Sequence, residues 1–311
     1  MPATATVILP TTAERWELVQ CSLACILEQD LRDLEVFIVG DGVGEISRER
    51  YREWQASDRR IRFFDYPKHV RRGEPYRHEL LISEASGRIV LYCCDRDLWF
   101  RHHVTTMVDA LEGWDFANTL AMCVERNGII GRRLPLDLRH NHRRWAFANA
   151  KAPRGGMPLS TVGHTLDAYR RLREGWSETP RSDATDTYMW QKFLRDASVR
   201  ATTIARPTLL YFSRDAHPGW PVPRRREELL RWLPRTKTQD GYLECLEAYC
   251  ASLHADHVKL FDENEVLTSR HRPIRAAMAV WLRHLQRLDL RFGGKGAAIW
   301  RRWRTRDRSV R

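Results

Sequence analysis

Short runs of apolar residues alternate along the chain with longer segments in which apolar residues recur every three or four positions. The uninterrupted runs predict strands of a sheet that is covered on both faces. They lie at residues 7–9, 34–39, 61–64, 88–93, 116–124 and 208–212. The longer segments predict helices, and these lie at residues 13–29, 47–57, 74–86, 102–112 and 184–196. Because strands alternate with helices, we expect an α/β fold with a mostly parallel sheet flanked by helices.

The alternation loosens after residue 130. Residues 131–158 are rich in Arg, His, Pro and Gly and are predicted to form a long loop that contributes to a cleft. The sequence after residue 212 is largely of helical type. We therefore expect a nucleotide-binding half at about 1–130 and an acceptor half at 131–215. A helical, basic C-terminal extension at 216–311 would follow this domain of residues 1–215.

Composition narrows the class of protein. Hydrophobic residues make up 43% of the 311 residues, which excludes a wholly disordered chain. No apolar run approaches the ~18 residues of a membrane-spanning helix, and the N-terminus lacks the basic stretch of a signal peptide. The seven cysteines form no CxxC pair, which is typical of a protein in a reducing compartment. These features predict a cytoplasmic protein.

Positive charge is concentrated at the C-terminal end. The formal net charge is +12, and residues 270–311 hold 13 basic residues against Asp289 and Asp307. Arg283, Arg287 and Arg291 follow one helical face, and a second face is apolar: Met278, Trp281, Leu282, Leu285, Leu288 and Phe292. A basic amphipathic helix, here followed by Trp300 and Trp303, is typical of a segment on an anionic membrane surface.

This basic tail leaves two other interpretations open. Its apolar face would equally suit a helix that packs against the domain and exposes its arginines. In a non-enzymatic protein, the tail itself would be the functional part and would bind acidic lipid or nucleic acid. The nearly neutral remainder of the chain argues against nucleic acid as the partner, because a uniform basic surface is absent from the sequence.

Candidate chemistry follows three of the predicted strands. Residues 10–12 (Pro-Thr-Thr) follow the first, Asp41 follows the second, and Asp95-Arg96-Asp97 follow the fourth. Ligands of open α/β sheets bind at the carboxyl ends of the strands. Two carboxylates separated by one residue can both reach a divalent cation, and Mg²⁺ or Mn²⁺ is commonly held by one or two carboxylates together with phosphate oxygens.

The order and spacing of these motifs resemble those of family 2 glycosyltransferases over about residues 1–215. The family opens with an apolar strand, Pro-Thr, a helix and a strand that ends in aspartate. The matching segment of this chain is VILPTTAERWELVQCSLACILEQDLRDLEVFIVGDG. Its next block, which ends in a D-x-D motif, is matched by GEPYRHELLISEASGRIVLYCCDRD. Its later acidic helix start is matched by GWSETPRSDATDTYMWQKFL.

The resemblance implies a GT-A fold and transfer of a sugar from a UDP-, GDP- or dTDP-linked donor to a saccharide or lipid-linked acceptor. It implies that Asp97 and Asp95 hold Mg²⁺ or Mn²⁺, and that Asp186 is the general base of an inverting reaction, as in cell-surface polysaccharide or glycolipid synthesis. The implied donor-binding residues are Pro10, Thr11, Thr12, Asp41, Arg77, Asp95 and Arg96. A tail on the inner face of the membrane would suit a lipid-linked acceptor.

Several residues keep alternative interpretations. Asp183 is a second candidate for the base, and both it and Asp186 lie at a predicted helix start, where aspartate also acts as a cap. Asp41 lies beside glycines, as turn residues do, and Arg77 would also suit a solvated helix face. His164 is a candidate metal or acceptor ligand, although a lone histidine is more often an ordinary hydrogen-bonded residue.

A sugar-1-phosphate nucleotidyltransferase is the alternative enzyme. It would also combine a parallel sheet, a nucleotide and a divalent metal. That class has a Gly-rich loop after its first strand, whereas this chain has residues 10–15, Pro-Thr-Thr-Ala-Glu-Arg, at that position. The sequence therefore favours the glycosyltransferase.

Overall fold

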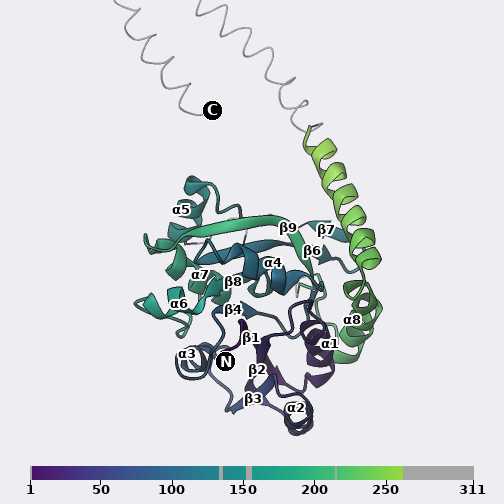
Figure 1. The fold of residues 1–311 in the computed structure, drawn as a ribbon. Helices are drawn as coiled ribbons and strands as arrows, with labels where there is room; N and C mark the ends of the chain where they lie inside the picture. Colours follow the sequence, from purple (N-terminus) through teal and green to yellow (C-terminus); the bar gives the residue numbers. More distant parts are fainter. Residues whose placement is uncertain (1, 133–135, 152–155, 214–215, 262–311) are drawn as a thin grey trace, which may run out of the picture. The chain divides into compact units, whose positions relative to one another are not determined.

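The computed structural model describes residues 2–132, 136–151, 156–213 and 216–261 (Figure 1). The chain divides into two compact units, residues 1–252 and 253–311. Of the second unit, residues 253–261 are described, and they are helical. The amphipathic segment and the tryptophans of the basic tail lie outside the described residues.

A nine-stranded sheet forms the centre of the first unit among the described residues. Its strand order is β3-β2-β1-β4-β8-β6-β9-β5, and β7 pairs with β6. The strands are β1 (Ala5–Ala13), β2 (Leu34–Val43), β3 (Ile61–Tyr66), β4 (Ile89–Tyr92), β5 (Leu98–Trp99), β6 (Phe116–Val124), β7 (Ile130–Arg132), β8 (Val162–Thr165) and β9 (Ala201–Tyr211).

The strand directions bring the carboxyl ends of the main strands to one edge. β1 is parallel to β2 and β4, and β2 is parallel to β3. β8 is antiparallel to both of its neighbours, β4 and β6, so that β6 and its parallel partner β9 run in the direction of β4. The segments that follow β1, β2, β4, β6 and β9 therefore all leave the sheet at the same edge.

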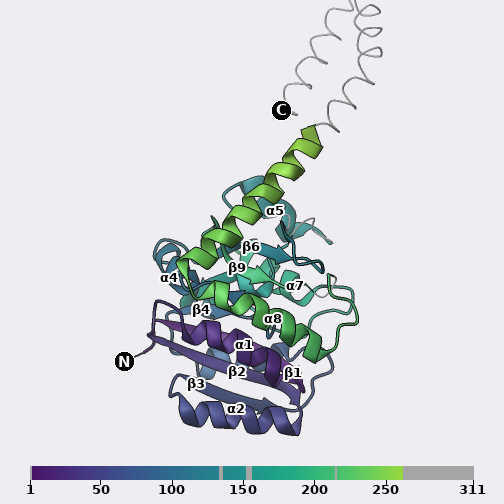
Figure 2. The same cartoon turned by 90° about the vertical axis from the view of Figure 1, so that its right-hand side faces the viewer.

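Helices cover both faces of the sheet (Figures 1 and 2). They are α1 (Trp16–Leu27), α2 (Glu45–Ser57), α3 (Glu74–Ser83), α4 (His103–Ala110), α5 (Asn141–Asn149), α6 (Leu166–Arg171), α7 (Thr185–Arg195), α8 (Val222–Thr236) and the 3₁₀ helix η1 (Leu159–Thr161). One core contains Val19, Tyr51, Met107 and Leu229 from α1, α2, α4 and α8. The opposite core packs α3, α5, α6 and α7 against the other face.

The predicted α/β fold with its mostly parallel sheet is confirmed, and each predicted strand and helix has a counterpart. The expectation that Pro10 closes the first strand was wrong, because β1 continues to Ala13 and Pro10 pairs with Val39 of β2. The carbonyl of Ile8 accepts a hydrogen bond from Cys93 N, just beyond β4. The backbone of residue 10 faces the same side of β1, beyond the last hydrogen bond to the β4 segment. The missing N–H of Pro10 therefore costs the sheet no hydrogen bond.

The C-terminal helical sequence begins within the first unit. α8 packs against α1, and Lys237 just after it forms an ion pair with Glu28 at 2.7 Å. Residues 239–252 are also helical and belong to this unit. The structure thus keeps residues through Ser252 with the sheet, where the sequence suggested a division near residue 215. None of the described helices is long and apolar enough to cross a membrane.

Candidate functional site

Asp97 lies in the loop that follows β4 and is fully buried. Its Oδ2 accepts a hydrogen bond from Ser160 Oγ at 2.5 Å, and its Oδ1 accepts one from Phe212 N, just beyond β9, at 3.1 Å. Burial raises the pKa of this carboxyl group to about 6, against the lowering effects of Arg96 and the two hydrogen bonds. An additional positive charge close by would therefore stabilise the anionic form of Asp97.

Asp95 is held between two guanidinium groups. Its Oδ2 accepts from Arg15 at 3.0 Å, and its Oδ1 lies 3.4 Å from the side chain of Arg96. Arg96 also donates through Nε to the carbonyl of Phe212 at 3.1 Å. The carboxyl ends of β1, β4 and β9 thus meet at one charged cluster.

Asp186 reaches the same cluster from the first turn of α7. It does not cap this helix, because Ala184 occupies the cap position and no side chain forms a cap hydrogen bond there. Instead, Asp186 Oδ2 accepts from Leu159 N at 3.2 Å. The next residue, Ser160, donates to Asp97, so two consecutive residues of η1 hold the two carboxylates. Burial raises the pKa of Asp186, and the positive charge of Arg77 opposes this rise.

Arg77 is buried on α3, and is not part of a solvated helix face. Its guanidinium group lies 4.8 Å from the ring centroid of Trp176 and donates through Nη2 to Arg72 O at 2.7 Å. Its Nε and Nη1 are buried, and no described residue accepts a hydrogen bond from them. Burial lowers the pKa of Arg77, and the charges of Asp186 and Glu74 raise it. Two donors of this buried cation are thus without a partner among the described residues, and the charge of Asp186 acts on the same guanidinium group.

Asp41 lies in the last residues of β2 and is buried. Its Oδ2 forms an ion pair with Lys68, and its Oδ1 accepts from His69 N at 2.6 Å. Gly73 approaches it closely with a φ of +65°, and a Cβ there would lie 3.3 Å from two side-chain atoms of Asp41. Asp41 is thus a positioned side chain between β2 and the segment before α3.

The side chains after Pro10 support this arrangement. Thr12 Oγ1 donates to Asp41 O at 2.6 Å, and Thr11 Oγ1 lies 3.5 Å from the hydroxyl of Tyr51. Residues 10–12 therefore lie beside Asp41 at the edge that also carries Asp95 and Asp97. The predicted donor-binding residues and aspartates come together along one edge of the sheet.

His164 has no described contact with this cluster, and its contacts fit the ordinary hydrogen-bonded histidine better than a metal or acceptor ligand. It is fully buried in β8 and paired with Val90 in the β4–β8 ladder. Its Nε2 lies 2.8 Å from the hydroxyl of Tyr92 and its Nδ1 lies 3.0 Å from Thr165 O. Burial lowers its pKa to about 4. Both ring nitrogens are therefore used by the interior of the protein.

Asp183 has no described contact with the cluster. Its Oδ1 accepts from its neighbour Ser182, and its backbone N–H donates to Pro180 O. The geometry favours Asp186 over Asp183 as the acidic residue of the site.

Sequence reasoning missed several residues that position this site. Arg15 and Lys68 pair with Asp95 and Asp41, and Ser160 holds Asp97. Arg15 had a usable signal, since it follows the first predicted strand at the same edge of the sheet. Ser160 had no such signal, because it lies at the border of the segment that was predicted to be a loop. In the structure, the strand β8 holds this segment in place.

The family of the chain follows from comparison with known proteins. The family model for Glycosyl transferase family 2 matches residues 6–171, more than half of the chain. The chain belongs to glycosyl transferase family 2. This membership favours the glycosyltransferase interpretation of the sequence over the nucleotidyltransferase. A search of curated proteins gives no match.

Solved structures show the fold. The crystal structure of S. aureus TarS 1-349 has a TM-score of 0.51 at 13% identity, covering 75% of this chain and 65% of that one. TarS 1-349 in complex with UDP-GlcNAc has a TM-score of 0.52 at 14% identity, covering 75% and 66%. The mannosyltransferase PcManGT from Pyrobaculum calidifontis, in complex with GDP-Man and Mn²⁺, has a TM-score of 0.46 at 18% identity, covering 90% and 84%. The chain spans just under two thirds of TarS 1-349 and shares its GT-A fold.

The acidic residues of the site suit a hard divalent cation. The described residues contain no cluster of three or more His, Cys, Asp or Glu side chains that could hold a metal ion. Asp95 and Asp97 nevertheless offer carboxylate oxygens at one strand end, and Mg²⁺ sites typically use one or two carboxylates with phosphate oxygens as the other ligands. The buried carboxyl of Asp97, whose anionic form burial disfavours, fits a cation as its partner.

Proposed function

We propose that the glycosyltransferase transfers a sugar from a nucleoside-diphosphate sugar to an acceptor hydroxyl with inversion, and that Asp186 is the base. The single observation that supports this most strongly is the pairing at η1, where Leu159 N binds Asp186 and Ser160 Oγ binds Asp97. A base and a D-x-D motif held by consecutive residues share one reaction space, as a single displacement requires.

Each end of the donor has candidate partners. Asp41 would bind the ribose or base, beside residues 10–12 at the end of β1. Arg77 would donate to the donor through its unpaired Nε and Nη1. Arg96, next to both aspartates, would face the diphosphate. The UDP-GlcNAc bound to a TarS structure of the same fold is consistent with a nucleotide sugar at this edge.

Asp95 and Asp97 would hold Mg²⁺ or Mn²⁺. When bound, the cation would supply positive charge that stabilises the departing diphosphate. Arg15 pairs with Asp95 at 3.0 Å and would keep this carboxylate oriented.

The displacement itself needs one bond to form and one to break. The acceptor oxygen forms a bond to the anomeric carbon on the face opposite the diphosphate, and the bond from that carbon to the diphosphate oxygen breaks, with its electron pair leaving on the diphosphate. The acceptor proton passes to Asp186. The raised pKa of Asp186 makes it a stronger base than an exposed aspartate, which suits general-base catalysis near neutral pH.

Membrane association at the inner face of the cell membrane is part of the same proposal, with saccharide or lipid-linked compounds as acceptors. It rests on the 13 basic residues and the amphipathic pattern of residues 270–311. A lipid-linked acceptor would then lie close to the enzyme.

A thermal-shift screen of UDP, GDP, dTDP and their sugars, with and without Mn²⁺, tests the proposal. A ligand that binds only the folded protein at a hundred times its Kd stabilises it by about 2.7 kcal/mol. We expect one nucleotide to raise Tm in wild type with Mn²⁺ and to lose this effect in Asp97→Ala. As a matched control, Asp109→Ala on α4 changes an exposed aspartate and should respond as wild type does. No shift with any nucleotide would contradict the proposal.

A further inference from the structure

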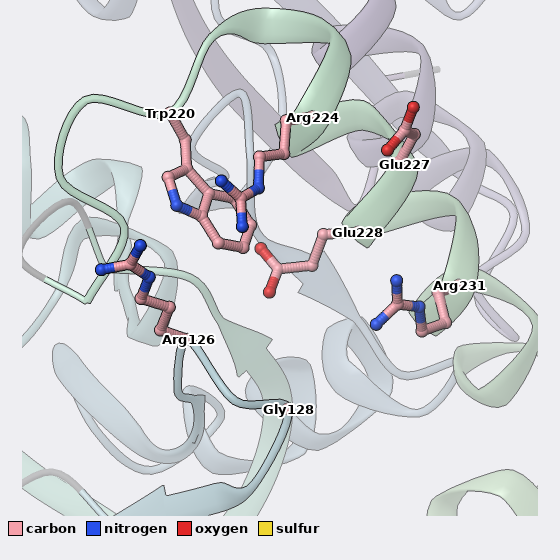
Figure 3. Close-up of a pocket in the computed structure, with 7 residues that line it drawn as sticks. All are labelled: Arg126, Gly128, Trp220, Arg224, Glu227, Glu228 and Arg231. Atoms are coloured by element: carbon pink, nitrogen blue, oxygen red, sulfur yellow. The ribbon is translucent and has the colours of Figure 1, made fainter.

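A cavity of about 160 Å³ lies between the β6–β7 turn and α8 (Figure 3). This volume is below the roughly 300–1,000 Å³ that is usual for sites of drug-sized ligands, so only a small ligand would fit. Its lining combines three arginines, two glutamates, a tryptophan and a glycine: Arg126, Gly128, Trp220, Arg224, Glu227, Glu228 and Arg231. None of these residues belongs to the donor-binding edge described above.

The three arginines of this cavity are exposed residues. Among the described residues, no carboxylate forms an ion pair within 4.0 Å with Arg126, Arg224 or Arg231, although Glu227 and Glu228 line the same cavity. Glu228 is instead paired with the buried His217, at 3.0 Å from its Nε2.

Two further features concern Trp220 in the wall of the cavity. The guanidinium of Arg224 lies over the ring of Trp220, 3.9 Å from the ring centroid, which fixes both side chains (Figure 3). Trp220 Nε1 is buried and has no hydrogen-bond partner among the described residues. An unpaired buried donor beside three arginines favours an acceptor group on a ligand.

The cavity lies at the same edge of the sheet as the proposed reaction space. β6 and β9 end at the same edge of the sheet as β4, and Arg126 lies just beyond β6. Arg225, adjacent to Arg224 on α8, donates to Trp220 O at 3.2 Å and to His217 O at 2.8 Å. Burial lowers the pKa of Arg225, and the charges of Arg96 and Arg15 lower it further. Arg225 thus contacts the segment that carries Trp220 and is close enough to Arg96 and Arg15 for their charges to affect it.

We propose that this cavity is the acceptor subsite of the glycosyltransferase and that it binds a sugar or polyol carrying a phosphate group. The three arginines come from a turn and from two positions on α8 (Figure 3). A tetrahedral phosphate can accept from several guanidinium groups at once, whereas one guanidinium satisfies a planar carboxylate. Glu227 and Glu228 would accept hydrogen bonds from hydroxyl groups of the same ligand.

This inference rests on the proposed function only in assigning the cavity to the acceptor. Its test measures binding and does not require sugar transfer. The probe is glycerol 3-phosphate, titrated into the full ¹⁵N-labelled chain while the indole N–H signal of Trp220 is followed, with Trp220→Phe to assign that signal. We expect a saturable shift in wild type. Arg126→Gln should weaken binding about ten- to a hundredfold, the effect of one lost charge-assisted hydrogen bond.

The matched control is Arg52→Gln, which removes the same charge from an exposed position on α2. It should leave the affinity for glycerol 3-phosphate within about twofold of wild type. An equal loss in Arg52→Gln and Arg126→Gln would contradict the proposal, because net charge alone would then explain binding. Absence of any shift of the Trp220 signal would also contradict it.

Two further probes define the ligand class. Inorganic phosphate that binds as tightly as glycerol 3-phosphate would reduce the cavity to a plain anion site and overturn the acceptor assignment. Glucuronate that binds equally well would overturn the choice of phosphate over carboxylate. We expect both to bind more weakly than glycerol 3-phosphate.

Nucleotide binding separates this proposal from the proposed function. Arg126→Gln should bind the nucleotide found in the thermal-shift screen as wild type does, and loss of that binding would mean that the cavity belongs to the donor site. If wild type binds glycerol 3-phosphate at Trp220 but no nucleotide, the proposed function fails while the cavity still binds a phosphorylated polyol.

Discussion

Replacing His164 by glutamine tests whether this residue is a core histidine or a metal ligand. In the structure His164 is fully buried between β4 and β6, and both of its ring nitrogens have partners, Tyr92 and Thr165. Burial lowers its pKa to about 4, so the ring stays neutral in the folded protein well below pH 6. His164→Gln removes this titration and leaves a side chain that can still form hydrogen bonds.

The size and sign of the effect follow from linkage. The unfolded chain binds a proton at His164 below its ordinary pKa of about 6.5, whereas the folded protein does so only below about 4. Each pKa unit equals about 1.4 kcal/mol, so the whole effect is about 3 kcal/mol. Because the folded-state pKa is the lower one, this stabilisation is complete above about pH 6.5 and is lost as the pH falls towards 4.

Urea unfolding at pH 7.5 and pH 4.5 measures this effect. The advantage of wild type over His164→Gln in free energy of unfolding should shrink by roughly 2 to 3 kcal/mol at the lower pH. The contributions of His102 and His103, whose pKa values burial also lowers, cancel in the difference. His142→Gln, which changes an exposed histidine on α5, should track wild type at both pH values. An unchanged difference between wild type and His164→Gln would refute the reasoning.

Three further outcomes follow from the site and the tail. Asp186→Asn should lower transfer by about 10²- to 10⁴-fold with nucleotide affinity kept within about threefold, measured by product release and calorimetry; full turnover would move the base to Asp183. Arg77→Lys should weaken nucleotide binding about ten- to a hundredfold in calorimetry, because lysine keeps the charge but loses the fork of donors; unchanged affinity would remove Arg77 from the donor site. Deleting residues 270–311 should abolish sedimentation with anionic liposomes, and persistent sedimentation would place membrane contact elsewhere.

Much of the sheet could be predicted because its strands are buried on both faces. Such strands are short, uninterrupted apolar runs, as in residues 34–39, and helices at regular spacing separate them. β8 was missed because it is four residues long and contains Gly163 and His164. Its strand form depends on the two antiparallel neighbours that flank it, which are distant in sequence.

α5 was missed for a related reason. Its sequence, NHRRWAFAN, is largely polar, and only Phe147 and Ala148 are buried. It packs against α7, and Gln191 of α7 donates to Phe147 O and Ala150 O at its C-terminal end. Tertiary contacts therefore decide its conformation more than its apolar pattern does.

The candidate site was predictable in its acidic residues and less so in their surroundings. The aspartates at positions 41, 95 and 97 follow strands that end at one edge, and strand order alone brings them together. The contact of Asp186 with that edge depends on η1, which no pattern in the sequence indicates. The arginine cavity was missed because it joins Arg126, at the β6–β7 turn, with side chains of α8 almost a hundred residues later.

Calorimetric titration of the matching nucleoside diphosphate into wild type and Asp97→Ala, with and without Mn²⁺, tests the central claim most directly. We expect wild type to bind in a metal-dependent manner and Asp97→Ala to show no effect of Mn²⁺, because the cation would lose the buried carboxylate that binds it. Equal, Mn²⁺-enhanced binding by both proteins would contradict a metal-bridged nucleotide sugar at the end of β4.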